Sequence, residues 1–132
     1  MAGTYGHEGI AEVHRVAFAD ALKQVRRLMV KQHFYVKLIP PRPTFPVDMT
    51  ADERTTMQKH VEYTTELFAQ GKVLIFGPVL DPDGPFGMAV FEVDDESEAH
   101  LLMNNDPSVL TGLNRFTVTR MKVGAAQGSS PR

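Results

Sequence analysis

The strongest structural signal in the chain lies at residues 72–93, KVLIFGPVLDPDGPFGMAVFEV. Two apolar runs, 72–79 and 86–93, flank the turn sequence Asp81-Pro82-Asp83-Gly84. Proline presets φ in such a turn and glycine supplies positive φ, so the segment predicts two strands joined as a β-hairpin. Residues 73–76 are apolar at every position. Helices on one face of the sheet would leave an apolar surface on the other, which we expect a second subunit to cover.

A strand and a helix are predicted before this hairpin. Residues 34–39 are β-branched, aromatic and aliphatic, which favours a strand. The proline-rich stretch that follows, through Pro46, is predicted as a loop. Thr50 and Glu53 have the spacing of a capping box, and Gly71 suits a helix end, which predicts a helix between them. Its inward stripe is expected to hold Met57, Val61, Thr64 and Phe68, with His60 and Leu67 beside it.

A second helix and a fourth strand are predicted after the hairpin. Asp94 or Asp95 caps the helix, whose inward residues Ala99, Leu102, Met103 and Asp106 precede Pro107. Residues 115–123 alternate as a strand does. The order β-α-β-β-α-β predicts an α+β fold of the ferredoxin-like type, with an antiparallel sheet and both helices on one face.

The chain is long enough for one core, and no linker divides it. It has 132 residues, and apolar residues recur at helical spacing from about residue 8 to residue 31. We therefore expect an N-terminal helical extension at residues 1–33, the ferredoxin-like domain at 34–123 and a disordered tail at 124–132.

Composition argues against several classes of function. The net charge of −2 and the lack of Trp argue against a nucleic-acid partner. No apolar run approaches the roughly 20 residues of a membrane span. The chain has no Cys, hence no disulfide or thiolate, and its first residues do not form a signal peptide. We expect a soluble cytoplasmic protein.

The best candidate for chemistry is the pair His60 and Asp106. The two helices of this fold lie side by side, so their inward-facing polar residues approach each other. A carboxylate beside a histidine fixes the tautomer and stabilises the imidazolium, as a general base near neutral pH requires. Asp106 is expected at a helix C-terminus, where the dipole disfavours its charge by about 0.3–1 kcal/mol. A structural alternative stays open: Asp106 caps the Asp-Pro turn, and His60 bonds to Thr64 or to the backbone.

Other residues are assigned smaller roles. Tyr35, Tyr63 and Phe76 are predicted as walls of a substrate pocket. Gly77 interrupts an apolar strand, which is typical of close approach by a ligand or another backbone. The remaining histidines form no metal-ligand motif, Ser108 lacks a nucleophile elbow, and the glycines match no nucleotide-binding fingerprint. We therefore expect no metal site.

Taken together, these residues resemble the YciI-like (YCII-related) family over about residues 34–123. The pattern is a helical His, a later Gly, a strand leading to Gly-Pro, and an Asp-Pro followed by Gly: His60, Gly71, Gly77-Pro78, Asp106-Pro107 and Gly112. The resemblance implies a ferredoxin-like fold assembled as a dimeric α+β barrel, and a His–Asp active site that falls on His60 and Asp106. It also implies acid–base chemistry without a cofactor, of the lyase, isomerase or dehalogenase type, on hydroxylated aromatic rings.

Three functional hypotheses follow. The first is a homodimeric or higher-order enzyme in which His60 and Asp106 move a proton on a small organic substrate. The second is a non-catalytic ligand-binding or oligomerisation module. The third is a haem-binding or oxygenase-type member of the wider dimeric-barrel group.

Overall fold

The computed structural model describes residues 14–22 and 30–128. The chain divides into two units, Met1–Val30 and Lys31–Arg132. In the first unit, residues 14–22 are helical and exposed, within the helix predicted for residues 8–31. The rest of that predicted helix, up to residue 29, and the last residues of the predicted tail lie outside the described residues.

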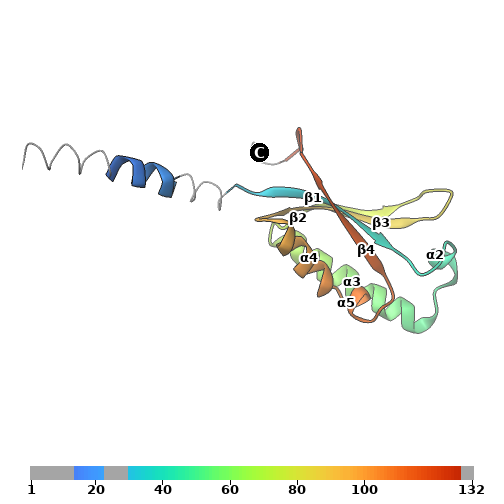
Figure 1. Cartoon of the computed structure of the whole chain (residues 1–132). Coiled ribbons are helices and arrows are strands. Elements are labelled where there is room, and N and C mark those ends of the chain that lie inside the picture. Colours follow the sequence, from blue (N-terminus) through green and yellow to red (C-terminus); the bar gives the residue numbers. More distant parts are fainter. Residues whose placement is uncertain (1–13, 23–29, 129–132) are drawn as a thin grey trace, which may run out of the picture. The chain divides into compact units, whose positions relative to one another are not determined.

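The second unit is built on a four-stranded antiparallel sheet. Its strands are β1 (Gln32–Ile39), β2 (Val73–Val79), β3 (Phe86–Val93) and β4 (Arg115–Met121), in the spatial order β2-β3-β1-β4. In the central register Val36 of β1 lies opposite Ala89 of β3 and Val118 of β4. Helices α3 (Ala51–Ala69) and α4 (Glu96–Asn104) both cover one face of this sheet (Figure 1). The predicted ferredoxin-like α+β fold is confirmed.

The core lies between that face and the helices. On β1 every second side chain is buried, beginning with Phe34, because successive strand residues point to opposite faces. The same face of β3 contributes Phe91, which pairs with Phe34. The buried cluster is completed by apolar residues of the sheet and of both helices: Val36, Leu38, Leu67, Val73, Ala89, Val93, Ala99 and Met103.

The predicted proline-rich loop contains a short helix, α2 (Phe45–Asp48). Pro46 stands in its first turn, where a missing N–H leaves no hydrogen bond unmade. Arg42 holds the segment in place by donating to Asp48 and, through two nitrogens, to both carboxylate oxygens of Glu53 at 3.0 and 2.7 Å. The expectation of an irregular loop is corrected because proline at a helix start does not oppose helical geometry.

The surroundings of Asp106 also differ from the prediction. Helix α4 ends at Asn104, and Asp106 is the N-cap of a further short helix, α5 (Pro107–Leu110). Pro107 therefore starts a helix instead of only ending one. As an N-cap, Asp106 lies where backbone N–H groups favour negative charge, the reverse of the predicted C-terminal position.

The inward face of α3 is rotated from the predicted stripe. Thr64 and Leu67 are buried, whereas Val61 and Phe68 are 49% and 51% exposed. The helix has a polar residue at most positions, so apolar periodicity alone did not fix its buried side. The rotation turns His60 toward the sheet, in line with Thr64 and Leu67.

Candidate functional site

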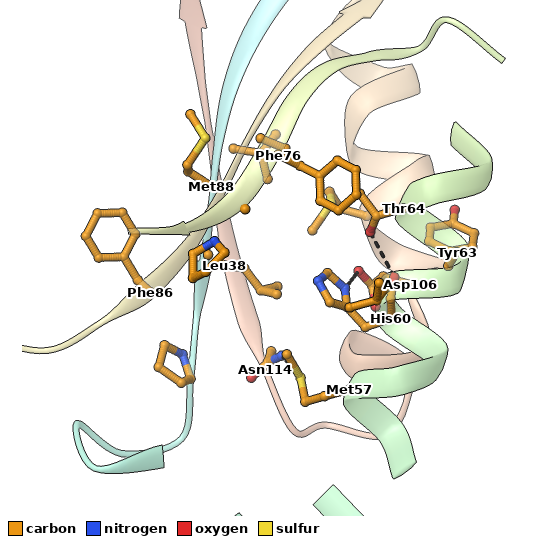
Figure 2. A pocket seen from close by; sticks show the side chains of 18 of the residues that line it. Leu38, Met57, His60, Tyr63, Thr64, Phe76, Phe86, Met88, Asp106 and Asn114 are labelled. Carbon is orange, nitrogen blue, oxygen red and sulfur yellow. Dashed lines mark hydrogen bonds and ion pairs between the residues drawn. The ribbon is translucent and has the colours of Figure 1, made fainter. Parts of the chain in front are cut away.

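A cavity of about 390 Å³ lies among the helices α2 and α3 and the strands. Its walls are mainly apolar side chains from all of these elements, and His60 stands on one side of it (Figure 2). The capping box of Thr50 and Glu53 fixes the start of α3 and so the helical phase at which His60 is presented.

His60 and Asp106 form a direct hydrogen bond in this cavity. Nδ1 of His60 lies 2.7 Å from Oδ2 of Asp106, and the side chains are 16% and 1% exposed (Figure 2). A carboxylate accepts, so Nδ1–H is the donor, which leaves Nε2 of a neutral imidazole as an acceptor. No other described residue makes a hydrogen bond with Nε2. The arrangement can therefore take up a proton at Nε2 while Asp106 stabilises the positive charge.

Ser108 holds the other oxygen of the carboxylate. Its backbone N–H and its hydroxyl donate to Oδ1 of Asp106 at 2.8 and 2.9 Å, and its side chain is fully buried. Each oxygen of Asp106 thus has its own donors, which fix the orientation of the buried carboxylate. The sequence suggested only a turn residue at Ser108, since a serine two residues after an aspartate carries no distinctive motif.

Tyr63 and Thr64 stand next to His60 on α3 and line the cavity, but their hydroxyls are engaged. Tyr63 donates to the carbonyl of Leu102 at 2.7 Å, and Thr64 donates to the carbonyl of His60 at 2.9 Å. Burial, with a smaller contribution from the Asp106 charge, raises the pKa of Tyr63. The phenol therefore keeps its proton at neutral pH and supports the helix packing.

The other predicted substrate-binding residues divide between the two faces of the sheet. Phe76 and Gly77 line the cavity, as Tyr63 does. Tyr35 is not among the lining residues; it lies between Phe34 and Val36 on the opposite face of β1. The assignment of Tyr35 to the pocket is corrected by the alternation of side chains along a strand.

Asn114 is a wall residue that the sequence analysis missed. It is 3% exposed and lines the cavity near Met57, to whose sulfur its Nδ2 donates at 3.3 Å (Figure 2). Its Oδ1 is buried and has no hydrogen-bond partner among the described residues. Asn114 follows a turn and belongs to no spacing pattern, so only the fold brings it to the cavity.

Two other histidines of the domain, His33 and His100, do not line the cavity and contact carboxylates of their own. His33 pairs with Glu92 at 2.9 Å and His100 with Glu96 at 3.3 Å. Within residues 14–22 and 30–128, no three His, Cys, Asp or Glu side chains are grouped so that they could hold a metal ion. No helix in the same part of the chain is long and apolar enough to cross a membrane.

Comparison with known proteins agrees with this architecture. Residues 33–122 match the model of the YCII-related domain. A solved structure that is similar is that of 5-chloro-2-hydroxyhydroquinone dehydrochlorinase (TftG) from Burkholderia phenoliruptrix, in complex with 2,5-dihydroxybenzoquinone. It is 23% identical, with a TM-score of 0.54 over 70% of this chain and 95% of the other, a likeness that establishes a shared fold. No curated protein matches the chain.

Proposed function

The chain belongs to the YCII-related domain family, and from this premise we propose that it is an enzyme that moves a proton on a small organic substrate without a cofactor. His60 is the proposed catalytic residue, and Asp106 positions and polarises it. The observation that carries the proposal is the geometry of the imidazole: Nδ1 is held by a buried carboxylate, and Nε2, with no described partner, belongs to a wall of an apolar cavity.

The proposed reaction begins with transfer of a substrate proton to Nε2 of His60. The electron pair left behind forms a new double bond, and either a leaving group departs or the proton returns at another carbon. The first outcome is a lyase or dehalogenase reaction, the second an isomerisation. The charge on the imidazolium is compensated by Asp106, whose own charge is supported by Ser108.

The dehydrochlorinase with the same fold supports the choice of substrate. Its solved complex contains a dihydroxylated quinone ring, and its name describes the loss of HCl from a hydroxylated chlorinated ring. A hydroxylated aromatic compound would also suit this cavity, because Phe76 and Met57 offer ring-packing contacts.

The test is a screen of hydroxylated aromatic compounds by thermal shift and by turnover, with three proteins. The unmodified chain should bind and convert at least one compound, and His60→Gln should lose turnover by at least about 10²-fold, the usual contribution of a general base. His100→Ala is the matched control, since His100 is half exposed on α4 and does not line the cavity. Equal turnover of His60→Gln and the unmodified chain would refute the proposed role.

A non-catalytic module is the second candidate, because Asp106 also caps α5 through Ser108. If the pair serves only structure, His60→Gln and Asp106→Asn should both lower the free energy of unfolding by several kcal/mol, and no compound should be converted. If the pair is catalytic, His60→Gln should instead leave the free energy of unfolding unchanged or raise it, whereas Asp106→Asn weakens the cap of α5 in either case.

A further inference from the structure

The polar groups of the cavity wall leave one point of attachment for a ligand. The hydroxyls of Tyr63 and Thr64 are bonded to carbonyl oxygens, and both carboxylate oxygens of Asp106 have donors. Oδ1 of Asn114 has no partner, but the atom is buried and so shielded from the cavity. Among the described side chains that line the cavity, Nε2 of His60 is therefore the one polar atom that is neither hydrogen-bonded nor fully buried.

The rest of the wall is apolar and carries no positive charge. Neither Lys nor Arg is among the lining residues, and Lys37, whose ammonium lies 4.4 Å from the centre of the Phe86 ring, belongs to the face of β1 opposite the helices. No described cation therefore faces His60 to bind a carboxylate or phosphate. Leu38, Met57 and Phe76 are among the apolar side chains that line the cavity with His60 (Figure 2). A second polar group on a ligand would lose its hydration without gaining a partner.

The volume of the cavity exceeds the volume that a single aromatic ring requires. A closed apolar cavity of about 150 Å³ accommodates a benzene molecule. The cavity here is about 390 Å³. A single hydroxylated ring anchored at His60 would therefore leave much of the apolar wall without contact.

We propose that the substrate is a neutral compound with one hydroxyl group on an aromatic ring and apolar substituents that together are about as large as the ring itself. Where the reaction is an elimination, one of these apolar substituents is the leaving group, such as a halogen. The hydroxyl bonds to Nε2 of His60, and the apolar substituents contact wall residues such as Leu38 and Phe76. This inference rests on the proposed function, since it places the reacting end of the substrate at His60. It adds the size and charge of the substrate and the number of its hydroxyl groups.

The experiment measures dissociation constants by calorimetry for phenol, para-ethylphenol, para-butylphenol and para-phenylphenol. Affinity should rise about fourfold for each added methylene until the cavity is full, as burial of one CH₂ group predicts. Para-hydroxybenzoate should bind at least about tenfold more weakly than para-methylphenol, because its carboxylate would be desolvated without a cation. Phloroglucinol, with its two further hydroxyls, should bind more weakly than phenol.

His60→Ala separates this inference from the proposed function. In the unmodified chain para-butylphenol should bind more tightly than butylbenzene; in His60→Ala the two should bind alike, and the preference for longer substituents should persist. Loss of the length preference, or tighter binding of the charged or polyhydroxylated compounds, would overturn the inference while leaving the role of His60 standing. Unchanged discrimination between para-butylphenol and butylbenzene in His60→Ala would instead overturn the role of His60.

Discussion

At the scale of single residues, the site depends on the separate hydrogen-bond partners of the two carboxylate oxygens of Asp106. Oδ2 of Asp106 faces His60, and Oδ1 faces Ser108. If Ser108 did not hold Oδ1, the carboxylate could rotate and the imidazole would lose its fixed tautomer. In the proposed mechanism, Ser108 would therefore act through Asp106, without touching a substrate.

Substitution Ser108→Ala should lower the free energy of unfolding by about 1.5–3 kcal/mol, the usual contribution of a hydrogen bond to a charged group. The measurement is urea denaturation. Ser97→Ala is the control, because the Ser97 hydroxyl bonds to Asp95 at an exposed site. A loss no larger at Ser108 than at Ser97 would contradict the role assigned to this buried hydroxyl.

Substitution by alanine should change the stability of the domain differently at Gly71 and at Gly77. Gly71 has a φ of +79° where the chain leaves α3, whereas Gly77 does not have positive φ, and a Cβ at either site would meet no atom within 4 Å. Gly71→Ala should therefore cost about 1–2 kcal/mol from backbone conformation alone. Gly77→Ala should leave the melting temperature almost unchanged, and equal effects at both sites would contradict this explanation.

At the scale of elements, α2 is attached to the start of α3 by charge. The two donors of Arg42 and the backbone N–H of Thr50 lower the pKa of Glu53 from 4.5 to about 2. Hydrogen bonds from Thr44 and Arg42 likewise lower the pKa of Asp48. Since Phe45 and Met49 of this segment line the cavity, the same contacts hold one of its walls.

The hydrogen bonds of Arg42 and Thr50 to Glu53 predict a pH dependence of stability. Between pH 4.5 and about 2 the unfolded chain binds a proton at Glu53 that the folded chain does not, so stability conferred above pH 4.5 is lost as the pH falls through this window. Arg42→Met should make the acid limb of the stability profile shallower there, as followed by circular dichroism during thermal melts. An unchanged limb in Arg42→Met would show that other carboxylates control it.

At the scale of the whole molecule, the sheet face opposite the helices bears on assembly. Ile75 is 57% exposed on β2, and the faces of β1 and β3 that carry Tyr35 and Val90 are not covered by α3 or α4. An exposed apolar strand beside such a face favours association. The predicted homodimer, with two sheets packed on these faces, remains a prediction.

Light scattering at micromolar concentration should give the mass of a dimer or a larger oligomer. Ile75→Lys should reduce that mass toward the monomer, because it would bury a charge between the sheets. Leu101→Lys is the matched control: Leu101 is 60% exposed but lies on α4. A monomeric unmodified chain, or dissociation by both variants alike, would contradict assembly through the sheet.

The order of strands and helices was predictable because it depends on local patterns: the turn at residues 81–84, the capping box at Thr50, and the β-branched, aromatic and aliphatic composition of β1. The approach of His60 to Asp106 followed from that order, since the two helices share one face of the sheet. Such features arise from interactions between residues close in sequence, or from the topology that those interactions dictate.

Only the tertiary structure decided the rotation of α3, the helix at Phe45, the N-cap role of Asp106 and the wall position of Asn114. Each depends on contacts between residues distant in sequence, such as Met57 with Asn114, which no local pattern specifies. Tyr35 illustrates the limit most directly. Adjacent strand residues point to opposite faces, so placing it in the cavity required knowing which face the helices cover.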